Sequence, residues 1–406
     1  MEAFLPALFL RAGYNTALVT VGAAMLGASA GAIGSFVLLR KRSLVSDAIS
    51  HATLPGLALA FIVMAALTGD GRWLPGLMIG AALSAGLGLL AVDWLTARTR
   101  LAEDAAIGAV LSAFFGAGVV LMTVVQTLQT GRQAGLSGYL LGSTAGMLRS
   151  EAQIIAVAAA LTGLAIFLLR RPFTLVCFDA GYAAVRGINV RATDLAMMGL
   201  LMAVTVIGLK VAGLVLIVAL TIIPPVAARF WTDRPGGMVV IAAALGAAAA
   251  WLGAVVSSLE RGLPTGALIV LFAFGLFLAS LLLSPRRGLL AGVVHRLGFQ
   301  GLVHERQGLM ALARGEPIYD AQTLRRLRRR GWIRPDGVAT PEGRTAAAAA
   351  QRDEARWSLY RHLYPEAAAG SPSQGIRPLT EVLPPDIIAD LDRRLGAAAG
   401  GQGEPA

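Results

Sequence analysis

The chain of 406 residues is 56% hydrophobic and 15% charged, with a mean hydropathy of +0.68 and a formal net charge of +11. So few charges exclude an ordinary soluble protein of this length, and the single cysteine, Cys177, excludes an internal disulfide and a cysteine-rich metal site. The bias is uneven, because residues 1–285 are mostly Ala, Leu, Val and Gly, whereas residues 286–406 hold about half of the arginines. The composition therefore predicts a membrane part followed by a soluble tail.

The membrane part is predicted to be an all-α polytopic domain over residues 1–288. A spanning helix needs roughly 20 mostly apolar residues, and nine segments meet that requirement. Residues 194–231 fit either two short spans or one span with a re-entrant piece, which leaves eight spans as the alternative. Pro224 and Pro225 are expected to end or kink the seventh span, since each removes a backbone donor. The nine segments are 14–39, 50–68, 73–95, 105–128, 151–169, 194–210, 212–231, 237–258 and 264–284.

Basic residues fall at every second boundary between the predicted spans, and the alternate boundaries are poor in Lys and Arg. Lys and Arg are enriched on the cytoplasmic side of membrane proteins. We therefore expect the N-terminus outside and the C-terminal tail in the cytoplasm. The boundary residues are Arg40, Lys41 and Arg42, then Arg98 and Arg100, Arg170 and Arg171, Arg229 and Arg234, and finally Arg286 and Arg287.

The segment SDAISHATLPG, residues 46–56, places two ionisable side chains at the mouth of a long apolar run. Asp47 and His51 are four residues apart, so a helix carries them on one face. An ionisable group at membrane depth costs several kcal/mol unless it is paired or faces water, and it therefore indicates a functional site. Carboxylate oxygen with imidazole nitrogen suits Mn, Fe or Zn, and a second helix from a partner subunit would raise two ligands to four. The alternative is that Asp47 caps the helix and His51 bonds a neighbouring backbone carbonyl.

Pro55 and Gly56 follow His51 by one helical turn. We expect them to break the ladder of backbone hydrogen bonds, and freed carbonyls are tolerated only where they line a cavity or meet protein. This favours a pore-lining helix, and the alternative is a simple proline kink.

Residues 174–191, TLVCFDAGYAAVRGINVR, lie in the longest predicted cytoplasmic loop. Asp179 is expected to be the N-cap of a short helix over AGYAAVRG, with Gly187 as its C-cap. A short helix between spans could dock on a cytoplasmic partner, and the alternative is a structured connector without one.

Several stretches, in the same order, resemble the permease subunits of metal-type ABC importers, which carry manganese, zinc or iron. One departure is Ser46, where the family often has Gly. The resemblance covers about residues 10–290, and five ordered matches are far more specific than any one motif. The stretches are GSFVLLRKRSLVSDAISHATLPGLALAF, YLLGS at residues 139–143, CFDAGYAAVRGINV, VAGLVLIVALTIIPPVAARFWTD and GLPTGALIVLFAFGLFLASLLLSPRRG.

The resemblance implies a role for the matching positions. Asp47 and His51 would coordinate the metal in the translocation path. The permease would be half of a dimer with an identical or homologous subunit, in a bacterial inner membrane, with cytoplasmic ATPase subunits and an external metal-binding protein as partners. No Walker A pattern occurs, so the chain is not expected to be an enzyme itself. The coupling helix in a groove of the ATPase would be the segment that contains Phe178, Asp179, Ala183, Ala184 and Gly187.

The resemblance also bears on the metal itself. The divalent ion would be the transported cargo, and no permanently bound cofactor is expected. Manganese, zinc and iron all accept nitrogen and oxygen ligands, so the ligand types alone do not select one of them.

The tail is predicted to hold a small winged-helix-like α+β domain over residues 295–396, followed by a disordered segment at 397–406. RQGLMALARG and DAQTLRRLRRRGWI are predicted as helices, the second with Asp320 as N-cap. WIRPDGVAT is predicted as a β-hairpin wing, and a third helix begins after Thr340 with Pro341 at its first position. This order resembles the diphtheria-toxin-repressor-like metalloregulators.

The tail offers few metal ligands and many arginines. Its only histidines are His295, His304 and His362, so no complete metal site is expected there. The basic helix between Arg325 and Arg330 could contact phosphates, anionic lipid or an acidic face of the ATPase. A tail tethered to the membrane is poorly placed to search a chromosome, so we expect membrane lipid or protein as its partner and not nucleic acid.

Three other functions stay open from the sequence. A permease for a metal chelate of the siderophore or cobalamin type would not need Asp47 and His51 on one face. An ion-coupled secondary transporter would carry further ionisable groups at mid-depth, where Lys210 is the main candidate. A membrane-tethered, metal-responsive regulator would act through the tail.

Overall fold

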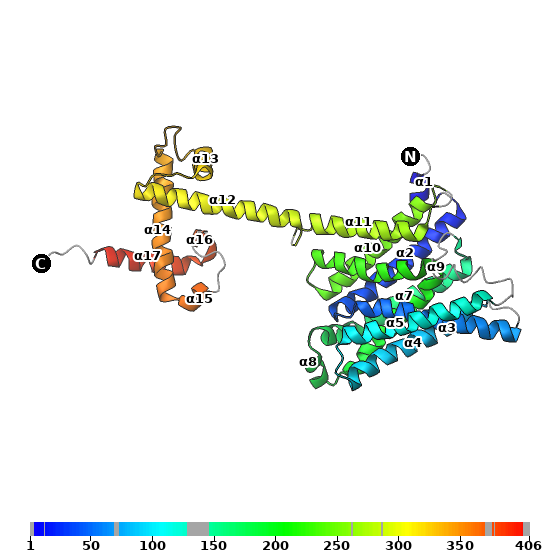
Figure 1. Ribbon diagram of the computed structural model, residues 1–406. Helices are drawn as coiled ribbons and strands as arrows, with labels where there is room; N and C mark the ends of the chain where they lie inside the picture. The colour runs from blue at the N-terminus through cyan, green and yellow to red at the C-terminus, as the bar shows by residue number, and fades with distance from the viewer. Residues whose placement is uncertain are drawn as a thin grey trace. The chain divides into compact units, whose positions relative to one another are not determined.

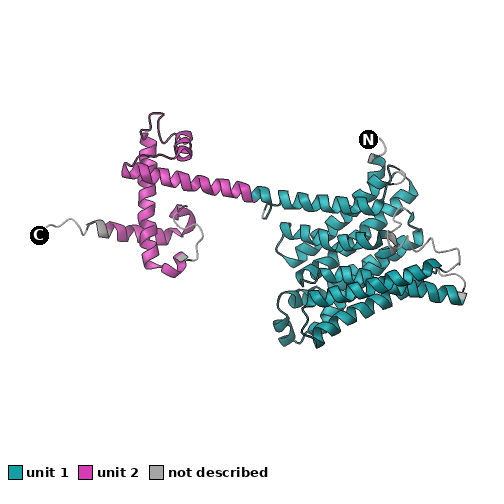
Figure 2. Cartoon of the chain, in the orientation of Figure 1, with its two compact units in different colours: residues 1–291 teal, residues 292–406 magenta. Residues whose placement is uncertain are grey.

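Long helices make up almost all of the computed structural model (Figure 1). The chain divides into two units, unit 1 over residues 1–291 and unit 2 over residues 292–406 (Figure 2). The structure describes residues 4–11, 13–68, 73–127, 146–260, 263–285, 287–369, 376 and 378–400.

Unit 1 is a bundle of long apolar helices. Within the described residues, nine helical segments are long and apolar enough to cross a membrane, which confirms the preferred span count. Two of the nine, Val190–Leu209 and Ala212–Trp231, lie in α9, which is kinked at Gly213, where φ is 74°. The helices are α1 (Phe4–Leu8), α2 (Tyr14–Leu39), α3 (Leu44–Thr68), α4 (Leu74–Arg98), α5 (Glu103–Thr127), α7 (Arg149–Phe178), α8 (Ala180–Val185), α9 (Val190–Trp231), α10 (Pro235–Ser257) and α11 (Thr265–Leu283).

The packing of unit 1 centres on α2 and α3. Helix α2 packs against α7, α9 and α10, and α3 packs against α4, α5 and α9 (Figure 1). Small residues bring the α3 and α4 backbones together, because a Cβ added to Gly56 would lie 2.1 Å from the carbonyl oxygen of Gly80. Close backbone approach through small residues is the usual way that membrane helices associate, since lipid supplies no hydrophobic drive between them.

Unit 2 is helical and has its own small core. Trp357, Tyr360, Leu379 and Leu391 are buried together. The predicted caps are present, since Asp320 accepts a hydrogen bond from the Thr323 amide and Thr340 accepts one from the Gly343 amide. Its helices are α12 (Leu289–Arg314, which begins at the end of unit 1), α13 (Ala321–Arg329), α14 (Pro341–Leu363), α15 (Pro365–Ala369), α16 (Leu379–Val382) and α17 (Pro385–Gly400).

The predicted wing is much smaller than expected. A turn closes where the Gly337 amide donates to the Arg334 carbonyl, and a single antiparallel bridge joins Ile333 to Ala339. Pro335 has no amide hydrogen, and the run on each side of the turn is too short for a ladder. The described residues of unit 2 therefore contain no strand, and the expected winged-helix α+β class is not shown.

The end of the chain also differs from expectation. Helix α17 continues to Gly400, so residues 397–400 of the predicted disordered segment are helical. Residues 401–406 lie outside the described part of the chain.

Candidate functional site

Asp47 and His51 lie together near the beginning of α3. The Nε2 atom of His51 is 3.4 Å from Oδ1 of Asp47, and the two side chains are 21% and 39% exposed. Because α3 begins at Leu44, Asp47 is a first-turn residue inside the helix and does not occupy the cap position. Asp47 and His51 therefore lie on the same face of α3, as predicted, and their side chains are partly exposed to solvent in a single copy of the chain.

The imidazole of His51 is held by an aromatic neighbour from α5. The rings of His51 and Phe115 meet edge to face, with centroids 4.9 Å apart and an interplanar angle of 84°. Nδ1 of His51 is buried and makes no hydrogen bond within the described residues. The alternative in which His51 bonds a backbone carbonyl is thus not seen, and Nε2 is the ring nitrogen that lies beside a carboxylate oxygen.

Pro55 and Gly56 do not break α3, contrary to expectation. The helix runs without interruption from Leu44 to Thr68, with Pro55 inside it. A Cβ added to Gly118 of α5 would lie 3.2 Å from Cδ of Pro55, so the proline ring packs against that helix. Together with the approach of Gly56 to α4, this makes the pair a helix-packing element, because neighbouring helices accommodate a membrane proline.

Ser46, the residue before Asp47, ties α3 to α9. Its hydroxyl lies 2.6 Å from the hydroxyl of Thr221, and both side chains are buried. The Thr221 hydroxyl also donates to the carbonyl of Val218 in its own helix. Ser46 must then donate to Thr221, and this bond fixes the first turn of α3 against α9.

Helix α8 matches the predicted short helix of the loop. The carboxylate of Asp179 accepts a hydrogen bond of 2.8 Å from the Tyr182 amide, and Gly187 has a left-handed backbone with φ 79°. Ala183 is fully buried, so it anchors the helix on the bundle. Phe178 and Val185 are 63% and 85% exposed, which leaves apolar side chains available to a partner.

Ion pairs at the same end of the bundle were missed from the sequence. Arg40 and Asp194 form a bidentate pair, although 154 residues separate them in the chain. The hydrogen bond to Asp194 raises the pKa of the Arg40 guanidinium, which keeps it charged. From the sequence, Arg40, Lys41 and Arg42 were interpreted only as markers of the cytoplasmic side. The sequence feature that could have indicated an ion pair was Asp194, an acidic residue at the start of an apolar span.

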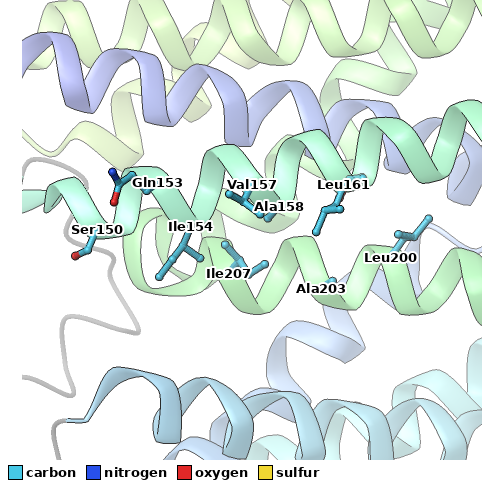
Figure 3. Close-up of a pocket in the computed structure, with 10 residues that line it drawn as sticks. Ser150, Gln153, Ile154, Val157, Ala158, Leu161, Leu200, Ala203 and Ile207 are labelled. Carbon is cyan, nitrogen blue, oxygen red and sulfur yellow. The ribbon is translucent and has the colours of Figure 1, made fainter.

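A groove between α7 and α9 is separate from the Asp47–His51 pair. Figure 3 shows side chains of the two helices facing each other, with Ile154 close to Ile207. The groove has a volume of about 660 Å³ and no ionisable residue in its lining. It therefore offers none of the His, Cys, Asp or Glu ligands that a transition-metal site uses. Its lining consists of Ser150, Gln153, Ile154, Val157, Ala158, Leu161, Thr162, Leu200, Ala203 and Ile207.

The remaining predicted residues are dispersed. In unit 2, Arg326 and Arg330 both pair with Glu305, and His304 lies 3.2 Å from Asp320. Among the residues that the structure describes, no group of three or more His, Cys, Asp or Glu could hold a metal ion. Residues 139–143, Arg286 and the side chain of Lys210 lie outside the described part.

The chain is similar to membrane proteins of metal transport systems. The model of the ABC 3 transport family matches residues 14–284. The manganese transport system membrane protein MntC of Bacillus subtilis (strain 168) is 38% identical over 298 residues, covering 73% of this chain and 67% of that protein. The zinc transport system membrane protein TroC of Treponema pallidum (strain Nichols) is 36% identical over 277 residues, covering 68% and 91%. The solved structure of PsaBC from Streptococcus pneumoniae in complex with Fab is similar with a TM-score of 0.61 and 28% identity, covering 71% of this chain and 98% of that one.

Proposed function

The chain belongs to the ABC 3 transport family, and from that premise we propose that Asp47 and His51 conduct manganese, zinc or iron ions through its membrane part. The chain is the multi-pass membrane permease of an ABC importer for one of these metals. It is not catalytic itself, so ATP hydrolysis falls to a separate subunit. The observation that carries the proposal is the carboxylate and imidazole pair on the open face of α3.

The pair is half of a metal site. Two donor atoms per chain are too few to replace the hydration shell of a divalent transition metal, but two α3 helices related by a two-fold axis supply four. The pair is partly exposed on one chain, which fits a site that a second permease subunit completes. A conduction site must hold its ion well enough to replace water and weakly enough to release it, and four nitrogen and oxygen ligands without thiolates meet that condition.

Helix α8 is the contact with the ATPase. Its buried Ala183 anchors it to the bundle, while its Val185 and the adjacent Phe178 at the end of α7 are exposed and apolar, as insertion into a groove requires. Because Ala183 is buried, a bulky residue there would disturb the bundle as well as the contact, whereas changes at Val185 address the contact alone. We infer that α8 lies in the cytoplasm, with the N-terminus of the chain outside and unit 2 inside, which the basic residues at every second span boundary support. An external metal-binding protein would deliver the ion from the other side.

Unit 2 is a regulator-like extension that adjusts transport. The order of α12, α13, a tight turn and α14 follows the order expected for a winged-helix metalloregulator. The arginines of α13 suit contact with anionic lipid or an acidic protein face. A metal chelate as cargo is disfavoured, because a wide path has no use for a narrow pair of ligands at Asp47 and His51.

Metal uptake by alanine variants tests the metal site. We expect Asp47→Ala and His51→Ala to abolish uptake of Mn, Zn and Fe while insertion, assembly and basal ATP hydrolysis persist. Asp47→Asn should fail as well, because it keeps the shape of the side chain and loses its charge. Asp104→Ala is the matched control, since Asp104 is an exposed carboxylate at the start of α5. If both alanine variants import metal at the wild-type rate, the pair is structural and the conducting ligands lie elsewhere.

A further inference from the structure

An ion-pair cluster at one end of unit 1 joins the loop before α3 to the start of α9. Both Nε and one terminal nitrogen of Arg40 donate to the two carboxylate oxygens of Asp194, each at 2.9 Å. The second terminal nitrogen of Arg40 donates to the carbonyl of Val176 at 3.3 Å. The Arg40 and Asp194 side chains are 22% and 12% exposed, so bulk water weakens the pair less than it would weaken a surface pair.

Arg42 extends the cluster to α5. Its Nε lies 2.6 Å from Oε1 of Glu103, and one of its terminal nitrogens lies 3.8 Å from Oδ2 of Asp194. Lys41, between the two arginines, has a left-handed backbone with φ 62°, a conformation that side-chain-bearing residues rarely adopt. Backbone hydrogen bonds close this turn, because the Lys41 amide donates to the Leu38 carbonyl and the Arg42 amide to the Val37 carbonyl. The turn therefore carries Arg40 and Arg42 at fixed positions beside the end of α2.

The cluster lies between the proposed coupling helix and the proposed metal ligands. Val176 is in the last turn of α7, three residues before Asp179, the N-cap of α8. On the other side, Arg42 precedes the start of α3 by two residues and Asp47 by five. Ala183 of α8 and Val45 of α3 belong to the same buried core, so apolar packing is continuous between them.

The geometry suits the transmission of movement better than stability. A buried ion pair adds little to stability compared with apolar residues of the same size, because desolvation offsets the attraction. A bidentate arginine–carboxylate contact, however, fixes both distance and orientation, whereas apolar side chains slide past one another. A displacement of α8 that moves the end of α7 thus reaches Arg40 and Asp194 directly.

We propose that Arg40, Arg42 and Asp194 are positioning residues that couple the displacement of α8 to the first turn of α3, and so to Asp47 and His51. The proposal rests on the proposed function of that pair and of α8. None of the three residues needs to touch the metal. Their contribution is to make each ATP-driven movement of α8 change the geometry of the metal ligands.

The test is the number of ATP molecules hydrolysed per metal ion imported, measured on the full chain with its ATPase in proteoliposomes with Mn as the probe. Asp194→Asn keeps the shape of the side chain and removes its charge. We expect it to assemble and bind Mn normally but to hydrolyse several-fold more ATP per ion. Asp194→Glu, which restores both carboxylate oxygens, should recover part of the coupling.

Asp93→Asn is the matched control. Asp93 of α4 pairs with Arg191 of α9 at 2.7 Å, and the arginine is 72% exposed. Asp93 lines the same small pocket as Arg42 and Asp194, but its ion pair is with Arg191 and not with a residue of the loop before α3. Its loss should leave the ATP-to-metal ratio unchanged. An equal rise of the ratio in Asp93→Asn and Asp194→Asn would overturn the proposal, because any ion pair between helices would then serve.

Two further outcomes decide the matter. If Asp194→Asn fails to assemble, Arg40→Lys takes its place, since lysine keeps the charge and loses the bidentate contact. A wild-type ratio of ATP hydrolysed to metal imported, in an assembled complex of either variant, rejects the proposal that these residues couple α8 to α3. Asp47→Ala is measured in the same vesicles. Wild-type import by Asp47→Ala would reject the metal site. If Asp47→Ala imports no metal but Asp194→Asn has the wild-type ratio of ATP to metal, the metal site stands and only the coupling role of Arg40, Arg42 and Asp194 is rejected.

Discussion

Unit 1 and unit 2 use charged residues in opposite ways. In unit 1 the few ionisable side chains near the spans make specific contacts, as Asp47 does with His51 and Asp194 with Arg40. In the described residues of unit 2 most ion pairs have an exposed partner, for example the pair between Arg314 and Glu316, and the pair between Arg306 and Asp353 is the buried exception. An ionisable group at membrane depth costs several kcal/mol, whereas an exposed pair contributes about 0–1 kcal/mol. A charge in unit 1 is therefore retained for what it does, and most charges in unit 2 are replaceable.

The two units also pack differently. Unit 1 joins helices through backbone contacts of small residues, as between Gly56 and Gly80, whereas unit 2 fills a small core with large side chains such as Trp357. A backbone contact leaves no side chain that can move aside. We therefore expect larger side chains at such contacts to destabilise unit 1 strongly, whereas single changes in unit 2 should have smaller effects.

The largest effect is expected from Gly80→Leu in α4. A Cβ at this position would lie 2.5 Å from Cβ of Ala60 and 2.6 Å from the carbonyl oxygen of Gly56, and neither atom can give way. Overpacking of this kind costs about 3 kcal/mol or more, a large share of the stability of a typical domain. The variant should not accumulate as folded protein, measured as a monodisperse peak after detergent extraction from membranes.

Gly86→Leu is the control for that prediction. Gly86 lies in the same helix, but the nearest atom to an added Cβ is Sδ of Met202, at 3.9 Å. This variant should accumulate normally. Equal loss of both variants would show that leucine in α4 is harmful wherever it stands, and the close approach of α3 and α4 would then have no special role.

The sequence predicted what depends on local order. The spans follow from hydropathy, and the caps at Asp179 and Asp320 follow from the preference of carboxylates for free helix amides. The proximity of Asp47 and His51 was predicted because four residues are about one helical turn, whereas their role as metal ligands stays a prediction. The break expected at Pro55 was wrong, because neighbouring helices support the proline, and the sequence does not show those neighbours.

Contacts between distant segments could not be predicted in this way. Asp194 reaches Arg40 across 154 residues, and Phe115 reaches His51 from another helix. Neither spacing nor composition links such positions. The wing was predicted from its turn residues, but the number of paired residues depends on packing within unit 2, and only one bridge forms.

A smaller effect is expected from Glu354→Gln in unit 2. Burial opposes ionisation of Glu354, but the hydrogen bond and charge of Arg306, with the charge of Arg361, outweigh it and lower the pKa of the carboxyl from its ordinary 4.5. Such a group contributes stability above its unfolded pKa, and the contribution is lost as the pH falls through the lower folded value. The variant should thus reduce hydrogen-exchange protection of α14 at neutral pH. The difference from wild type should begin to shrink as the pH falls to about 4.5 and should vanish once the pH has fallen through the lower folded pKa.

Glu366→Gln provides the comparison for Glu354→Gln, since Glu366 is an exposed carboxylate in the first turn of α15. It should leave the protection of α14 unchanged throughout. The assignment to Glu354 would be contradicted if its own variant matched wild type at neutral pH, or if the difference persisted in acid.

The smallest effect on transport is expected from removal of unit 2. A chain stopped after Gly288 keeps every residue of the two large buried cores, which end at Ile269 and Leu214. It also keeps the last contacts of α11, because the Ser284 hydroxyl donates to the Phe230 carbonyl and Arg287 pairs with Asp233. The shortened chain should still insert and import metal into proteoliposomes, with uptake changed only by the loss of the adjustment that unit 2 provides. A chain stopped after Leu278, which loses those contacts, should fail to assemble. The opposite result would be a chain stopped after Gly288 that inserts and binds its ATPase but imports no metal. An essential step of transport would then lie in unit 2, and the conclusion that the functional charges belong to unit 1 would be wrong.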